Sequence, residues 1–319
     1  MTAGATVTVA RPGLLTTVQD LGRWGHQAMG VPVAGPMDTC AHRAANALAG
    51  NRPAAASLEI TLIGPELVVS RAVRAAVAGA VFDVAVNGTP VPSTGAFDVP
   101  AGGRLAFGRR RSGARAYLAF AGGIDTAPVL GSRATHLVSG MGGLEGRALT
   151  GGDVLPLGQP PTATTAGGAA PPSGYLPEAG RARLRVLPGP QDAWFAPHAL
   201  EALASASFTV ATASNRMAYT LEGPPLPVAR AGEPLSEPVP FGAIQVPAGG
   251  APLLLMADRQ TAGGYLKIAT VILADLPVAG QLAPGDVVGF VPCTRAEAMR
   301  ALIDRERALL RAAPGAATS

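Results

Sequence analysis

The sequence predicts a mainly β fold of barrel or sandwich type, divided into two domains. The 319-residue chain contains 41 glycines and 30 prolines, a high content of turn-forming residues without a collagen-like period. Its apolar segments are short, rich in valine and bounded by Gly or Pro, which is typical of β-strands. Its length is also close to the limit at which one hydrophobic core divides into two.

The predicted strands follow one another along most of the chain. Asn87-Gly88 gives the clearest hairpin signal, because both residues tolerate the positive φ angles of a tight turn. The segments that we expect to form strands are residues 7–9, 67–69, 81–86, 117–120, 184–187, 253–256, 268–273 and 287–291.

Three segments depart from this pattern and predict helices: residues 38–49, 192–204 and 294–312. Asp38 can cap the first helix, and Thr294-x-x-Glu297 is a capping box at the start of the third. A segment rich in Pro, Ala, Gly and Thr lies between the two halves of the chain. We therefore predict an N-terminal domain at 1–165, a linker at 166–181 and a C-terminal domain at 182–319 that includes the C-terminal helix.

The basic residues do not indicate a nucleic-acid partner. The chain carries 25 basic and 21 acidic residues, and its arginines are scattered. The densest run, Arg109-Arg110-Arg111, lacks interleaved aromatic residues and is interpreted as a solvated loop or a local anion contact.

Several kinds of chemistry are also excluded. The only lysine, Lys267, lies outside any Gly-x-x-x-x-Gly-Lys-Ser/Thr motif, and no Gly-x-Ser-x-Gly elbow is present. The four histidines lack metal-ligand spacing, so no metal is predicted. The two distant cysteines, together with the absence of a leader and of an apolar run of about 18 residues, predict a cytoplasmic protein with no membrane contact.

Two segments carry an excess of functional residue types. In residues 16–38, Asp20 and Arg23 stand with Gln, Trp and His residues between glycines. Either these two side chains pair with each other and hold the loop, or they contact a ligand or another chain.

The second segment covers residues 214–217, 235–237 and 242–270. A single connection between two predicted strands contains an acid, two cations, an amide and a phenol, as a polar small-molecule site requires: Asp258, Arg259, Gln260, Tyr265 and Lys267. Because every other basic residue is an arginine, the one lysine indicates a role that a guanidinium cannot fill. The alternative is that Lys267 extends from a strand edge into solvent.

Five stretches resemble the KipA family, also called the C subunit of 5-oxoprolinase or allophanate hydrolase subunit 2, and the matching part of biotin-dependent urea carboxylase. They are TTVQDLGRWGHQAMGVPVAGPMD (16–38), LPGPQDAWF (187–195), SNRMAYTLEG (214–223), LSEPVPFGAIQVPAGGAPLLLMADRQTAGGYLKIATVILADL (235–276) and PGDVVGF (284–290). The resemblance implies two cyclophilin-like β-barrel domains. It also implies two partners, a KipI-like B subunit together with a LamB/YcsF-type A subunit. With this chain, these partners use ATP to open 5-oxo-L-proline to L-glutamate.

The resemblance further implies which residues line the active cleft: Asn215, Arg216, Gln245, Asp258, Arg259, Gln260, Tyr265 and Lys267, with Asp20 and Arg23 near it or near the interface with a partner. Lys267 and Arg259 are expected to stabilise oxyanion charge, and Asp258 or Tyr265 to move protons. Two other functions remain open. The chain could serve a urea-type carboxylase with biotin on a separate carrier, or it could regulate a kinase inhibitor through a KipI-like partner.

Overall fold

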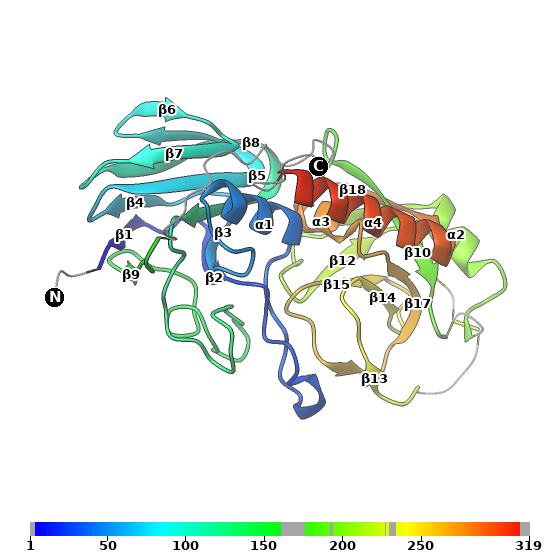
Figure 1. Ribbon diagram of the computed structural model, residues 1–319. Helices are drawn as coiled ribbons and strands as arrows, with labels where there is room; N and C mark the ends of the chain where they lie inside the picture. The colour runs from blue at the N-terminus through cyan, green and yellow to red at the C-terminus, as the bar shows by residue number, and fades with distance from the viewer. Residues whose placement is uncertain (1–3, 161–175, 192–193, 227, 230–233, 313–319) are drawn as a thin grey trace. The chain divides into compact units, whose positions relative to one another are not determined.

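The computed structural model describes the chain except for residues 1–3, 161–175, 192–193, 227, 230–233 and 313–319. The chain divides into two compact units (Figure 1), which are described separately below. The first comprises residues 1–23, 34–176 and 306–319, and the second comprises residues 24–33 and 177–305. Most of the predicted linker at 166–181 lies outside the described residues, so the predicted domain boundaries stay a prediction.

The first unit is built on a nine-stranded sheet that curls as a half-barrel. Its main path runs β2-β3-β8-β4-β1-β9, while β5 pairs with β8 and also carries β6 and β7. The strands are β1 (Thr6–Arg11), β2 (Leu15–Gln19), β3 (Ser57–Thr61), β4 (Glu66–Val69), β5 (Val73–Val86), β6 (Thr89–Val91), β7 (Gly95–Val99), β8 (Arg104–Phe120) and β9 (Val154–Pro156).

Helix α1 (Thr39–Leu48) packs on β5 and β8 through small side chains. Ala44 and Ala45 meet Ala76 on the sheet in a common buried cluster, where small residues let the helix approach closely. The Asp38 carboxylate accepts a hydrogen bond of 2.8 Å from the Ala41 amide, which caps the helix. The predicted first helix is therefore confirmed.

The second unit contains a closed barrel in the order β10-β17-β14-β15-β12-β11-β18. The parallel pairing of β10 with β18 closes it. The elements are β10 (Arg181–Pro188), α2 (Ala199–Ser205), β11 (Ser207–Val210), β12 (Ala218–Glu222), β14 (Ala243–Val246), β15 (Leu253–Leu255), β17 (Leu266–Val271), α3 (Leu276–Gly280), β18 (Val287–Pro292) and the part of α4 (Arg295–Ala312) up to residue 305. Outside the barrel, β13 (Glu237–Pro238) pairs with β16 (Ala262–Gly263), and η1 (Gln27–Met29) is a short 3-10 helix.

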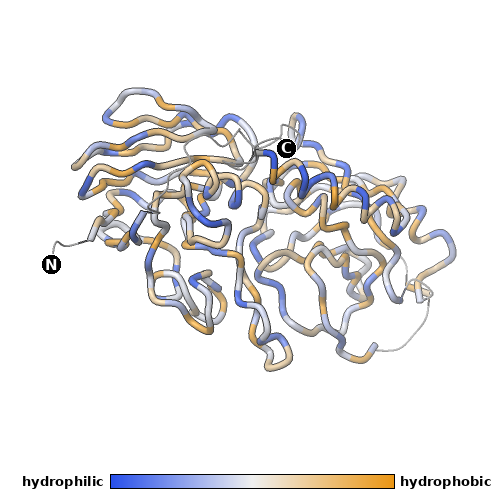
Figure 2. The backbone as a smooth tube through the Cα atoms, viewed as in Figure 1, coloured by the Kyte–Doolittle hydropathy of each residue, from blue (hydrophilic) through white to orange (hydrophobic). Residues whose placement is uncertain are grey.

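The mainly β fold class, with a few short helices and a C-terminal helix, is confirmed. Hydrophobic and hydrophilic stretches alternate along the strands of the first sheet (Figure 2), as expected when one face covers a core. The hairpin at Asn87-Gly88 is present between β5 and β6, with φ values of 51° and 82°. The capping box of α4 is present too, because the Glu297 amide donates to Thr294 Oγ1 and the Thr294 amide donates to Glu297 Oε2.

Three local predictions were wrong. Strands β5 and β8 are far longer than expected, because bulges near Gly79 absorb the irregularities that would otherwise end the strands. The arginine run 109–111 lies inside β8, so its interpretation as a loop was wrong, whereas the alternative, a local anion contact, is present as the exposed pair Arg111–Asp83. Helix α2 begins only at Ala199, after a proline, whereas the prediction began at residue 192, which lies outside the described residues.

Candidate functional site

The polar connection predicted from the sequence joins β15 to β17 in the second unit and contains β16. Lys267 lies inside β17 rather than in the connection, because its backbone pairs with Gln245 of β14 beside a bulge. The pairing of Glu237 with Gly263 brings β13 to the same connection. Segments from residues 189–191, 215–217, 237–245 and 256–267 contribute to one polar cluster, whose individual contacts follow.

Lys267 is buried, with 4% of its side chain exposed, and its ammonium is paired. Nζ donates to Glu237 Oε2 at 3.0 Å, and the Gln191 amide donates to the same oxygen at 2.7 Å. Gln191 Oε1 in turn accepts from the backbone amide of Lys267. The hydrogen bonds from Lys267 and then from Gln191 lower the pKa of Glu237, so this carboxylate stays ionised at neutral pH. The three side chains hold the ammonium in one place.

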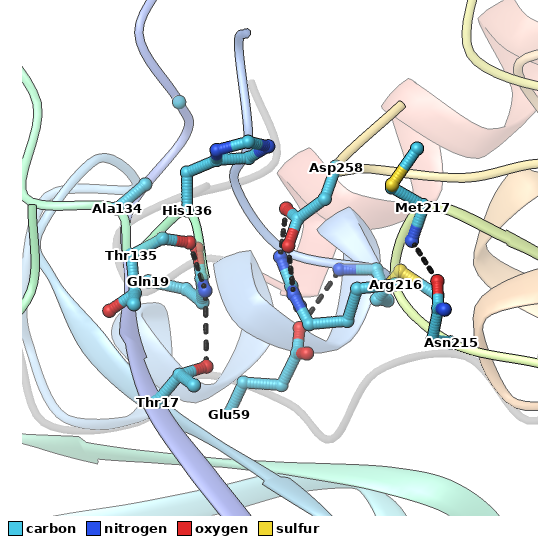
Figure 3. Close-up of polar contacts among 12 residues, drawn as sticks. Thr17, Gln19, Glu59, Ala134, Thr135, His136, Asn215, Arg216, Met217 and Asp258 are labelled. Carbon is cyan, nitrogen blue, oxygen red and sulfur yellow. Dashed lines mark hydrogen bonds and ion pairs between the residues drawn. The ribbon is translucent and has the colours of Figure 1, made fainter. Parts of the chain in front are cut away.

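Arg216 and Asp258 form a second, fully buried ion pair (Figure 3). Arg216 Nε and Nη2 each donate to one oxygen of the Asp258 carboxylate, both at 3.0 Å. The Asp258 backbone amide also donates to the Arg216 carbonyl. This bidentate geometry fixes the turn after β15 against the turn before β12.

Arg259 and Gln260 lie on the turn that follows β15, and Gln245 faces them from β14. Arg259 Nε donates to the Val239 carbonyl at 2.9 Å, and its guanidinium carbon is 5.4 Å from the centre of the Phe241 ring. Gln260 Nε2 donates to Gln245 Oε1, and Gln245 Nε2 donates to the Tyr265 carbonyl, both at 3.4 Å. This amide chain connects the Arg259 turn to the residues just before Lys267.

The two remaining predicted residues of this segment differ in character. Asn215 Oδ1 accepts from the backbone amides of Met217 and Ala218, so its side chain shapes the turn that carries Arg216 (Figure 3). The Tyr265 side chain is 51% exposed. In the described part of the chain, its hydroxyl has no hydrogen-bond partner, so it is available to a ligand.

Asp20 and Arg23 belong to the first unit, where both hold the segment that follows residue 128. Asp20 accepts from the Ser132 hydroxyl and from the Arg133 amide, each at 2.6 Å. Arg23 is 1% exposed and donates to the carbonyls of Val129 and Ala134 at 2.9 Å. Through these contacts, both side chains hold the loop that contains residues 129–134.

The first unit also contains a buried polar group that the sequence prediction omits. Glu59 Oε2 accepts from the Tyr117 hydroxyl at 2.6 Å and from the Met37 amide at 2.9 Å. Gln19 Nε2 donates to Thr17 and to the Thr135 carbonyl (Figure 3). These polar side chains lie on one face of β2, β3 and β8, since Thr17 pairs with Glu59 and Glu59 with Tyr117 across the strands.

The predicted site residues do not include Glu237 and Gln191, the partners of Lys267, although Glu237 lies in the segment 235–237 that the sequence analysis singled out. The sequence offers one signal for Glu237, an isolated acid between a serine and a proline in a polar segment.

Among the described residues, no group of three or more His, Cys, Asp or Glu side chains could hold a metal ion. Within the same residues, the structure contains no helix that is long and apolar enough to cross a membrane.

A closed barrel that carries buried cations and amides at one connection defines a protein with a site for a polar small molecule. The model of the family described as carboxyltransferase domain, subdomain A and B, matches residues 29–292, so the chain belongs to this family.

The chain is similar to two characterised proteins and to one solved structure over most or all of its length. The chain is 38% identical to the C subunit of 5-oxoprolinase from Escherichia coli K12, over 94% of this chain and 95% of that protein. It is 37% identical to urea amidolyase of Lachancea kluyveri, over 89% of this chain and 17% of that protein. The crystal structure of the K. lactis urea amidolyase matches with a TM-score of 0.91 and 31% identity, over 100% of this chain. The match covers 20% of that longer chain.

Proposed function

We propose that this chain is the C subunit of an ATP-dependent 5-oxoprolinase, which opens 5-oxo-L-proline to L-glutamate. The observation that carries the proposal is the match to a relative of that name over 95% of the relative's length. In the urea amidolyase relative, by contrast, the similar stretch is 17% of the protein. The proposed partners are a KipI-like B subunit together with a LamB/YcsF-type A subunit, and this chain is proposed to be inactive without them.

The reaction defines what the site must do. The ring C–N bond of the lactam breaks, the oxygen of water joins the carbonyl carbon, and the ring nitrogen becomes the amine of glutamate. ATP is converted to ADP and phosphate and supplies the driving force. Negative charge develops on the lactam oxygen, and a fixed hydrogen-bond donor in a buried site stabilises it most effectively.

Lys267 fits this requirement. An ammonium has three N–H donors, and in the described part of the chain only Glu237 accepts from Lys267 Nζ. The other two donors are available to a substrate oxygen, while Glu237 and Gln191 hold the amine in position. We assign Lys267 to the lactam oxygen.

Proton transfer is assigned to Tyr265 ahead of Asp258. Both oxygens of the Asp258 carboxylate accept from Arg216, so a proton on Asp258 would break a buried ion pair. Tyr265, by contrast, is exposed and lies in the same connection. ATP is proposed to act at the level of the complex, and Asn215, Arg216, Gln245 and Gln260 to shape the cleft.

The test is release of glutamate from 5-oxoproline and ATP by the complex reconstituted from all three proteins. Lys267→Ala is expected to lower kcat by about 100-fold or more, which is typical for the loss of one oxyanion donor. Lys267→Arg tests whether charge alone suffices, and Arg181→Ala, an exposed arginine on β10, is the matched control with an unchanged rate. An unchanged rate in Lys267→Ala contradicts the assignment. A wild-type complex that releases no glutamate contradicts the function.

A second candidate is supported by the TM-score of 0.91 to the K. lactis urea amidolyase. In that case the chain would transfer a carboxyl group from biotin on a separate carrier protein to urea or a related amide. Avidin distinguishes the two functions, because it blocks a biotin-dependent transfer and leaves a lactam-opening complex active.

A further inference from the structure

The charges of the polar cluster do not balance. It contains three cations, Arg216, Arg259 and Lys267, and two carboxylates, Asp258 and Glu237. Both carboxylate oxygens of Asp258 accept a hydrogen bond from Arg216. Glu237 accepts from Lys267 and Gln191 through one oxygen. Each acid is thus already paired with another cation, and Arg259 is left without a carboxylate.

The guanidinium of Arg259 is nonetheless held in a defined plane. Nε donates to the Val239 carbonyl at 2.9 Å, and the group lies over the Phe241 ring, a favourable place for a cation. In the part of the chain that the structure describes, the terminal nitrogens Nη1 and Nη2 have no hydrogen-bond or ion-pair partner. The side chain is only partly buried, so these nitrogens can be reached by a ligand.

Burial has a measurable consequence for this group. It lowers the pKa of Arg259 to about 10, against the opposing effect of the neighbouring Asp258 carboxylate. The guanidinium therefore stays protonated at neutral pH, but its charge is incompletely compensated. An anion bound at Nη1 and Nη2 would restore the balance of charge.

We propose that Nη1 and Nη2 of Arg259 bind the carboxylate of the substrate as a bidentate pair. This inference rests on the proposed function and assigns Arg259 to substrate selection rather than to the reacting carbonyl. Two parallel N–H donors match the two oxygens of a carboxylate, a geometry that an ammonium does not offer. The site thereby selects an acidic lactam over a neutral one, while Lys267 contacts the lactam oxygen.

The amide chain from Gln260 through Gln245 to Tyr265 connects the two functions. It joins the turn that carries Arg259 to the residues just before Lys267. A Cβ on Gly263 would lie 3.0 Å from Gln260 Nε2 and 3.1 Å from Gln245 Nε2. Glycine at this position therefore lets the amides lie directly against the backbone of β16.

The experiment compares two ligands of the same ring, 5-oxoproline and the neutral 5-oxoprolinamide, by titration calorimetry on the reconstituted complex. The wild type is expected to bind 5-oxoproline about 10- to 100-fold more tightly than the amide, as for a charge-assisted bidentate contact. Arg259→Gln is expected to remove this preference, because it weakens the binding of 5-oxoproline and leaves the binding of the amide unchanged. Arg259→Lys keeps the positive charge but lacks the two parallel N–H donors, so it is expected to retain a small part of the preference for 5-oxoproline.

Steady-state kinetics supply the second readout, with Arg181→Gln as a matched control on an exposed arginine. Arg259→Gln is expected to raise KM for 5-oxoproline with little change in kcat. A wild-type preference that persists in Arg259→Gln, or a loss in kcat alone, overturns the inference but leaves the proposed function intact. A wild-type complex that neither binds nor opens 5-oxoproline overturns both.

Discussion

Arg216 and Asp258 are nearly inaccessible, with 3% and 2% of their side chains exposed, and each satisfies the other. Removal of one partner leaves an uncompensated charge in the interior, which costs about 3–5 kcal/mol. We therefore expect Arg216→Met to lower the free energy of unfolding by about that amount, measured by denaturant titration. The exposed pair Arg111–Asp83 is the control, and Arg111→Ala is expected to cost less than about 1 kcal/mol.

The double variant Arg216→Met/Asp258→Leu completes this test. Because the double variant removes both charges of this pair, its loss of stability is expected to be smaller than the sum of the two single losses. Additive losses would mean that the two side chains act independently, contrary to the geometry.

His42 is a buried histidine that the structure keeps neutral. Its Nδ1 lies 2.9 Å from Ser57 Oγ, and its Nε2 lies 3.3 Å from Asn46 Nδ2. Asn46 Nδ2 also donates to the Ala55 carbonyl, while Asn46 Oδ1 accepts from Asn51, so the orientation of this amide is fixed. The two ring nitrogens of His42 thus face a buried hydroxyl and a buried amide instead of water.

This arrangement predicts a dependence of stability on pH. Burial lowers the pKa of His42 from 6.5 to about 4, although the nearby carboxylates of Asp20 and Glu59 act in the opposite direction. Between these two pH values the unfolded chain binds a proton that the folded chain does not. Stability is therefore expected to fall as pH is lowered from 6.5 to 4, by about 3 kcal/mol from this group.

The measurement is the free energy of unfolding at several pH values for the wild type and for His42→Gln. The variant is expected to lose the part of the pH dependence that lies between 6.5 and 4, whatever its stability at pH 7. His198→Gln is the control, because His198 is 79% exposed and its replacement should leave the slope unchanged. An identical slope in His42→Gln contradicts the prediction.

At this same scale, the sequence predicted which residue types gather at the 256–267 connection but not how they pair. Glu237 and Lys267 are 30 positions apart in the sequence, and the pairing of β13 with β16 brings Glu237 to this connection. Arg216 meets Asp258 across 42 positions. Such pairings depend on strand register, which local composition does not determine.

Among the elements, the junction of β10 with β17 allows little change. Gly189 donates its amide to the Ile268 carbonyl, and a Cβ on Gly189 would lie 2.0 Å from the Lys267 carbonyl oxygen. We expect Gly189→Ala to displace β17, lower stability by about 1–3 kcal/mol and reduce glutamate release by the complex. The control is Gly249→Ala, since nothing lies within 4 Å of a Cβ there. Equal stability of the two variants would contradict this account.

Helices with clear end signals were predictable, and long strands were not. The acid at position 38 and the Thr294–Glu297 box mark where α1 and α4 begin, because these side chains bind the helix termini directly. The 17 residues of β8 contain two glycines and a run of arginines, which locally favour a loop. Pairing with β3, β4 and β5 outweighs that local preference.

For the whole molecule, composition was enough to predict a mainly β chain, but closure of the barrel was not predictable. The closing contact joins β10 to β18 in parallel, with Arg181 opposite Val287. These two paired residues are 106 positions apart in the sequence, and no short motif specifies which strands of a barrel pair. Local sequence patterns left barrel and sandwich open, and the expectation of a β-barrel came from a family resemblance that spans most of the chain.

The single lysine of this chain gives it one amine side chain, and that amine is buried and paired. An amine-selective reagent can therefore report on the Lys267–Glu237 contact, since the small exposed fraction of Lys267 and its pairing with Glu237 slow the reaction in the native protein. We expect slow labelling of the native protein and rapid labelling in denaturant, both followed by mass spectrometry. Glu237→Gln should accelerate native labelling, and rapid labelling of the wild type would contradict the buried geometry.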